Sequence, residues 1–150
     1  ILGYSDPKAK RYAIDLGIGM QLTNILRDLK EDMQRDRVYL PLDDMGRFGY
    51  SINELKECVV NEQFLQLMNY EAARAYSYFA SGLNLLPYLS RRSRGFPAVL
   101  VELYKHILRD IERRGFNVFD EKVQLSKRAK CFVTARGWAR SLLPMGNGSV

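Results

Sequence analysis

The sequence has few of the residues from which metal and redox sites are usually built. Its 150 residues include one histidine, His106, which excludes a metal site made of several histidines. The two cysteines, Cys58 and Cys131, lack the close spacing of zinc ligands, and we interpret them as reduced thiols of a cytoplasmic protein. No apolar run reaches the roughly 18 residues that a membrane span needs. These absences leave oxygen ligands as the main candidates for any metal chemistry.

Period-two alternation, internal repeats and low-complexity tracts are also lacking, and apolar residues recur at helical spacing instead. We therefore predict an all-α protein. Asp6 before Pro7 is typical of a helix start, and Ser51 followed by Glu54 matches a capping box. The predicted helices cover residues 7–35, 51–57, 62–86, 97–114 and 126–142. Residues 37–41 are expected to be extended, and residues 145–150 to form a disordered tail.

Charge is distributed unevenly along the chain, whose formal net charge is +6. Residues 1–90 carry 10 basic and 12 acidic side chains, whereas residues 91–150 carry 13 basic and 5 acidic ones. A basic C-terminal part suits an anionic partner, such as phosphate groups, a membrane surface or nucleic acid. An ordinary solvated basic surface explains the same composition equally well.

Four polar residues mark the most informative helix. Gln21, Asn24, Asp28 and Asp32 are spaced by three, four and four residues, which places them on one helical face. Two carboxylates one turn apart repel each other, and a divalent cation removes that conflict. Mg²⁺ prefers oxygen ligands and often bridges carboxylates to phosphates. The alternative is a solvated face on which Asp28 pairs with a nearby basic side chain.

The residues around these four resemble a known motif. Residues 16–32, which read LGIGMQLTNILRDLKED, and residues 37–41, RVYLP, resemble the second aspartate-rich motif of the squalene/phytoene synthase family. Similarity resumes at residues 103–116. The resemblance implies the C-terminal helices of an isoprenoid (terpenoid) synthase fold, with a first aspartate-rich motif upstream of Ile1. We thus expect residues 1–144 to be the C-terminal part of a synthase domain, with little activity alone.

The same resemblance implies roles for individual residues. Asp28 and Asp32 would bind metal and act in catalysis, with Asn24 as a further ligand, and Tyr104 would lie near the diphosphate. Diphosphate-binding roles fall on Gln21, Asn24, Arg37 and Lys122. Lys122 stands where the family usually has arginine, so it keeps the charge and loses the bidentate fork. Arg37 is equally compatible with a structural ion pair to Asp32 or Asp36.

The implied reaction joins two prenyl diphosphates, farnesyl or geranylgeranyl, head to head to a cyclopropylcarbinyl diphosphate. It leads towards presqualene diphosphate and squalene in hopanoid or sterol synthesis, or towards phytoene in carotenoid synthesis. The implied metal is Mg²⁺, with Mn²⁺ as an alternative, and NADPH is needed only for squalene. We expect prenyl diphosphates and a peripheral membrane contact as partners, and no nucleic acid.

Two other hypotheses stay open at this point. One is a non-catalytic basic helical module that binds a membrane surface or nucleic acid, and the other is a helical domain from a degenerate synthase. Substrate chain length, product and oligomeric state are left open.

Overall fold

The computed structural model describes residues 6–120, except for the side chain of Arg92. This range is helical and contains no strand, which confirms the all-α prediction. The predicted helix over 126–142, the predicted tail and Lys122 lie outside the described residues. The elements in chain order are α1 (Pro7–Met33), α2 (Leu42–Phe48), α3 (Ile52–Lys56), α4 (Glu62–Gly82), η1 (Leu83–Tyr88) and α5 (Arg91–Arg113).

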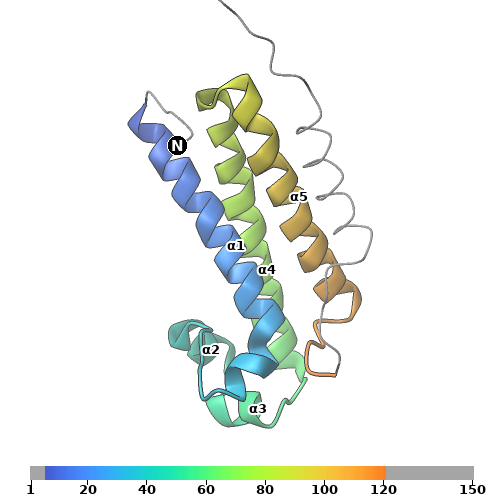
Figure 1. Ribbon diagram of the computed structural model, residues 1–150. Coiled ribbons are helices and arrows are strands. Elements are labelled where there is room, and N and C mark those ends of the chain that lie inside the picture. Colours follow the sequence, from blue (N-terminus) through green and yellow to red (C-terminus); the bar gives the residue numbers. More distant parts are fainter. Residues whose placement is uncertain (1–5, 121–150) are drawn as a thin grey trace, which may run out of the picture.

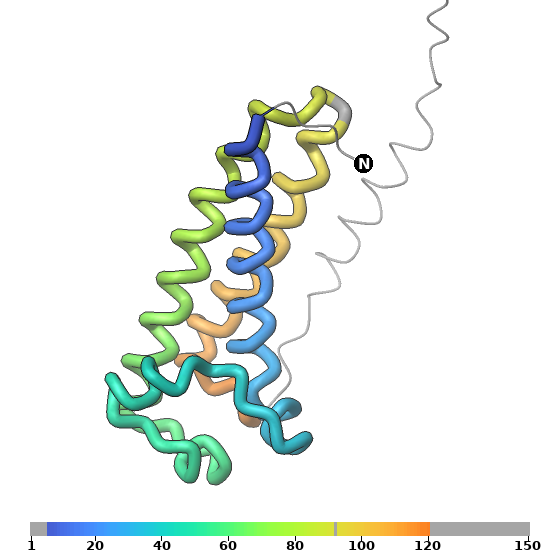
Figure 2. Tube along the Cα trace, turned by 90° about the vertical axis from the view of Figure 1, so that its left-hand side faces the viewer, coloured from blue at the N-terminus to red at the C-terminus, as the bar shows by residue number. Residues whose placement is uncertain are grey.

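The long helices α1, α4 and α5 run side by side, and the short helices α2 and α3 lie together at one end of this bundle (Figure 1; Figure 2). Local signals explain why the helices start where they do. The Asp6 side chain accepts a hydrogen bond of 2.8 Å from the Lys8 backbone N–H at the start of α1. Ser51 and Glu54 form the predicted capping box of α3.

The core lies between α1 and α4, where two glycines allow the helix backbones to approach closely. A Cβ atom added to Gly19 would lie 2.9 Å from the ring of Phe79, and one added to Gly82 would lie 2.9 Å from Leu16 Cδ1. Phe79 itself is 0% exposed. Glycine at these two positions therefore sets how tightly α1, which carries the candidate site, is held against α4.

Helix α2 was not predicted from the sequence. It has only seven residues and includes Gly46, so it shows little helical periodicity. Its signals lie at its ends. Asp43 and Asp44 occupy the first turn, and Gly49 ends the helix in the left-handed region with φ of 68°.

The predictions for the α4 to α5 region were wrong at two boundaries. Helix α4 ends at Gly82, and Pro87 lies inside the 3₁₀ helix η1 rather than stopping a longer α-helix. Helix α5 begins at Arg91, so Pro97 lies inside it instead of starting it. The earlier start is supported by Arg94, whose guanidinium donates to the carbonyls of Leu89 (2.9 Å) and Pro87 (3.2 Å). These bonds stabilise the sharp passage from η1 into α5.

The segment after α5 returns to the core. Gly115 and Phe116 both have positive φ, 60° and 61°, and reverse the chain. The ring of Phe119 then packs against Phe64, with 5.3 Å between the ring centroids, and the Phe119 carbonyl accepts a hydrogen bond from Lys30. Residues 116–120 are thereby held beside the C-terminal half of α1.

Candidate functional site

We call Gln21, Asn24, Asp28 and Asp32 the polar stripe. At 100° per residue they span about 80° of the circumference of α1. The buried residues Leu16, Gly19 and Leu26 lie on the opposite side of the helix, where Leu16 and Gly19 pack against α4. Gln21 is exposed, and the other three stripe residues are partly buried. The structure thus presents the stripe on the side of α1 that faces away from the α1–α4 core.

Asp28 has a basic partner, as the alternative interpretation of the sequence allowed. The neighbouring Arg27 donates from Nε to Oδ1 at 2.8 Å and from its terminal nitrogen to Oδ2 at 2.5 Å. Both side chains are 23% exposed. This hydrogen bond is the main cause of the raised pKa of Arg27, which burial opposes. A carboxylate held in this fork is fixed in orientation, and its oxygens keep lone pairs for a further ligand.

Tyr104 of α5 lies near this pair. It is partly buried, its ring centroid lies 6.3 Å from that of Phe79, and it is among the groups that raise the pKa of Arg27. Two residues far apart in the chain, Arg27 and Tyr104, are therefore brought to one side of α1. The sequence predicted a role for Tyr104 and none for Arg27, although Arg27 stands next to Asp28, the stripe residue to which it donates two hydrogen bonds.

Arg37 is tied to the stripe through the main chain. Its backbone N–H donates to the carbonyl of Asp32 at 2.9 Å, and Asp36 has a φ of 55° that turns the chain back to make this bond. The Arg37 side chain is exposed and forms no ion pair with Asp32 or Asp36 in the part of the chain that the structure describes. The structural ion pair considered from the sequence is therefore not formed.

A pocket of about 250 Å³ lies between the second half of α1 and the segment after α5. It is lined by Arg27, Lys30, Glu31 and Gln34 of α1 and by residues 118–120. Two basic side chains, Lys30 and the Asp28 partner Arg27, thus border this hollow, and none of the four stripe residues lines it. No group of three or more His, Cys, Asp or Glu residues suitable for a metal occurs within residues 6–120. The stripe offers two carboxylates and two amides, which are oxygen ligands of the kind that Mg²⁺ prefers.

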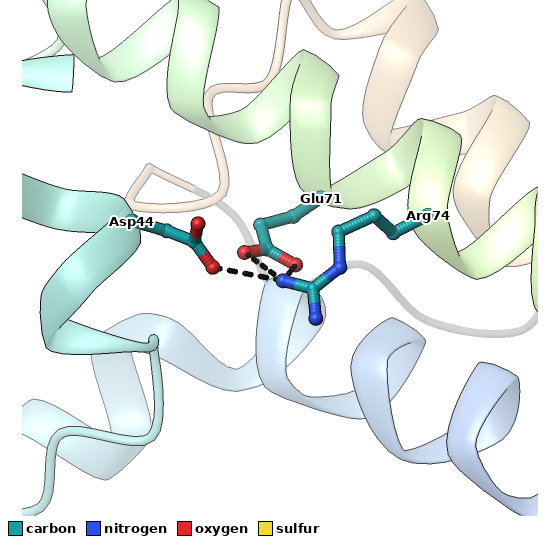
Figure 3. A network of polar contacts seen from close by, with 3 residues as sticks. All are labelled: Asp44, Glu71 and Arg74. Atoms are coloured by element: carbon teal, nitrogen blue, oxygen red, sulfur yellow. Dashed lines mark hydrogen bonds and ion pairs between the residues drawn. The ribbon is translucent and has the colours of Figure 1, made fainter. Parts of the chain in front are cut away.

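A second acidic site was missed by sequence analysis. Glu71 of α4 is fully buried, and Figure 3 shows its carboxylate and that of Asp44 of α2 directed at Arg74. One guanidinium nitrogen of Arg74 lies 2.8 Å from Asp44 and 3.0 Å from Glu71. The signal was present, because Glu71 stands at the helical spacing of the core residues Phe64, Leu67, Met68, Ala72 and Ala75.

Glu71 differs from the acids of the polar stripe because it is fully buried. Burial is the main cause that raises the pKa of Glu71 to about 7, and the nearby Asp44 contributes to this rise against the opposing charge of Arg74. Two carboxylates that share one guanidinium cannot both be balanced by it, so a proton supplies the rest. We call Asp44, Glu71 and Arg74 the buried acid cluster. Its position at the α2–α4 contact makes it a structural element that holds α2 in place.

Comparison with known proteins agrees with this architecture. The family model "Squalene/phytoene synthase" matches residues 1–129, and the chain belongs to that family. A 15-cis-phytoene synthase from Synechocystis is 39% identical over 129 residues, covering 86% of this chain and 38% of that protein. The chain therefore spans less than half the length of this curated relative.

Solved structures show the same fold. A dehydrosqualene synthase crystallised with a ligand superimposes with a TM-score of 0.71 at 31% identity, covering 85% of this chain and 46% of that one. A squalene synthase from Alicyclobacillus acidocaldarius gives a TM-score of 0.72 at 22% identity, over 75% of this chain and 43% of that one. The helices are thus those of the isoprenoid synthase fold, as the sequence resemblance implied. None of the helices within residues 6–120 is both long and apolar enough to cross a bilayer.

Proposed function

We propose that this chain supplies one helix that binds metal and diphosphate in a prenyltransferase as long as its full-length relatives. The reaction would join two prenyl diphosphates head to head, giving a cyclopropylcarbinyl diphosphate on the way to phytoene or squalene-type products. The observation that carries the proposal is the polar stripe, two acids and two amides on the face of α1 that points away from the core. Membership of the family supports this assignment.

The chemical demand is to stabilise a departing diphosphate, which carries concentrated negative charge. Asp28, Asp32 and Asn24 would hold Mg²⁺, or Mn²⁺ in its place. The bound ion would supply Lewis-acid stabilisation of that charge. Arg27 orients Asp28 through its two hydrogen bonds. Arg37, held next to Asp32 by its backbone, offers an exposed guanidinium to phosphate oxygens.

Gln21 is the exposed, N-terminal member of the stripe, and its amide would hold phosphate oxygens. Tyr104 of α5 would donate a hydrogen bond to the diphosphate. Lys122 would bind diphosphate oxygens through its charged amino group. A squalene-forming protein would also need NADPH for a reductive step, whereas a phytoene-forming one would not.

The test uses Asp28→Asn and Asp32→Asn in a protein of the relatives' full length that contains this chain. We expect each to lower turnover of prenyl diphosphate by about 100- to 1000-fold, because a stabilising charge is lost at the leaving group. Calorimetry should show weakened Mg²⁺ binding in both variants. Asp43→Asn, an exposed acid on α2, is the matched control and should keep normal turnover. Normal turnover in Asp28→Asn would refute the proposed metal role.

A further inference from the structure

Helix α2 packs against α4 through aromatic and charged side chains. The ring of Phe48 lies 5.3 Å from that of Tyr70, and the Arg47 guanidinium lies 4.8 Å from the centre of the same Tyr70 ring. Beside them, the buried acid cluster joins the two helices through a single nitrogen of Arg74 (Figure 3). A helix of seven residues is too short to be stable alone, so this contact holds α2 in place.

The segment between α1 and α2 links the buried acid cluster to the polar stripe. Its first residue, Arg37, donates its backbone N–H to the Asp32 carbonyl at 2.9 Å. Its last residue, Pro41, accepts a hydrogen bond of 2.9 Å from the Met45 N–H in α2. Between these ends, the side chain of Leu40 is buried in the core. Because the segment is short and tied at both ends, a shift of α2 is passed on to Arg37.

The buried acid cluster has balanced charges only while one acid carries a proton. Asp44 of α2 and Arg74 of α4 are the charged groups that act most strongly on Glu71. Helix α1 also packs against α4, but its Arg27 is engaged by Asp28 instead. Burial is the main cause that raises the pKa of Glu71 to about 7, so its proton is lost as pH rises through neutrality. One guanidinium then faces two carboxylates, whose repulsion pushes α2 away from α4.

We propose that the buried acid cluster positions Arg37 for the substrate diphosphate by holding α2 against α4. The inference rests on the proposed function, in which the Arg37 guanidinium binds phosphate oxygens. It gives Asp44, Glu71 and Arg74 a positioning role that goes beyond stability, since they act on the site through α2. Loss of the shared proton loosens α2 and lowers the affinity for diphosphate, while the chemical step is unchanged.

The kinetic test compares the wild type with Glu71→Gln in a protein of the relatives' full length. Between about pH 6 and about pH 8, the KM for prenyl diphosphate should rise about three- to five-fold more in the wild type than in Glu71→Gln, because a charge-assisted hydrogen bond is weakened. Ionisation of the substrate affects both proteins equally and cancels. The kcat should follow one profile in both. A cluster that served stability alone would lower kcat through loss of folded protein and leave KM unchanged.

Two further variants and a control sharpen this comparison. Asp44→Asn should flatten the KM profile as Glu71→Gln does, because Arg74 then serves Glu71 alone. The exposed Glu57→Gln is the matched control and should follow the wild type. In an Arg37→Gln background, Glu71→Gln should have no further effect on the KM profile, because the residue through which the cluster acts is gone. An additive effect in that background would overturn the proposal.

Hydrogen exchange supplies a readout that needs no substrate. At about pH 8 the amides of residues 37–45 should exchange about three- to ten-fold faster in the wild type than in Glu71→Gln, whereas at about pH 6 the two proteins should match. Comparison at equal pH removes the intrinsic pH dependence of exchange. Equal exchange of the two proteins at both pH values would overturn the proposal.

Arg37→Gln separates this inference from the proposed function. By itself it should raise KM about ten-fold, since a charge-assisted hydrogen bond to the diphosphate is lost. An unchanged KM in Arg37→Gln would overturn both the role of Arg37 in diphosphate binding and the proposal that depends on it. A raised KM in Arg37→Gln, with identical pH profiles of the wild type and Glu71→Gln, would overturn the proposal alone.

Discussion

Two pairs of acidic side chains in this protein differ in almost every physical respect. Asp28 and Asp32 lie one turn apart on a single helix and are both partly exposed, while Asp44 and Glu71 come from two helices and Glu71 is fully buried. Each pair has an arginine beside it. Arg27 grips one carboxylate with two hydrogen bonds, whereas Arg74 shares one nitrogen between two carboxylates.

The comparison indicates that the full burial of one member, Glu71, sets the second pair apart from the first. A partly exposed pair keeps carboxylate oxygens within reach of a ligand, so it is suited to a metal. A pair with one buried member and one shared cation takes up a proton or loses stability, so it is suited to holding two helices together. The polar stripe is therefore expected to govern activity, and the buried acid cluster to govern stability.

Removing the shared cation should give the largest effect on stability. Arg74→Met leaves Asp44 and Glu71 without a counter-charge, which we expect to lower the free energy of unfolding by about 2–3 kcal/mol at neutral pH, because solvent partly screens the 35%-exposed Arg74. Chemical denaturation followed by circular dichroism measures this. Arg109→Met, a half-exposed arginine on α5, is the control and should change stability by less than about 1 kcal/mol. A similar small loss for Arg74→Met would remove the distinction between the two pairs.

Proton uptake by Glu71 predicts an unusual pH dependence. Its pKa is about 7 in the folded protein and has an ordinary value near 4.5 when unfolded, so the folded state binds the extra proton between these values. Stability from this group is full below about pH 4.5 and falls as pH rises towards 7, by up to about 3 kcal/mol.

Glu71→Gln imitates the protonated carboxyl and should abolish most of this fall. Thermal melts at about pH 5 and about pH 8 provide the comparison. The exposed Glu57→Gln is the control and should follow the wild type. If Glu71→Gln and the wild type lose stability equally over this range, Glu71 does not hold the proton.

The smallest expected effect concerns the stability of the α1 pair. Asp32→Asn removes like-charge repulsion with Asp28 one turn away, and should raise the free energy of unfolding by a few tenths of a kcal/mol. Denaturation in low salt measures the change, which high salt should reduce. A loss of more than about 1 kcal/mol would mean that Asp32 has a structural role in the protein.

The polar stripe was predictable because it depends only on helical periodicity. Spacing by three and four residues places Gln21, Asn24, Asp28 and Asp32 on one face of any α-helix, and the structure confirms the helix that carries them. The caps at Asp6 and Ser51 were predictable for the same local reason. The boundaries of α5 were not, because the turn before Pro97 is held by bonds from Arg94 back to η1.

The sequence by itself determined the helical class, the long helix α1 and the shared face of its four polar residues, since these follow from backbone geometry and near neighbours in the chain. Tertiary structure alone decided that Tyr104 lies near Arg27, that Asp44 meets Glu71 and that the start of α1 packs against the passage from η1 into α5. Those contacts join residues tens of positions apart. Their energies come from burial and from shared charge, which exist only once the helices have packed.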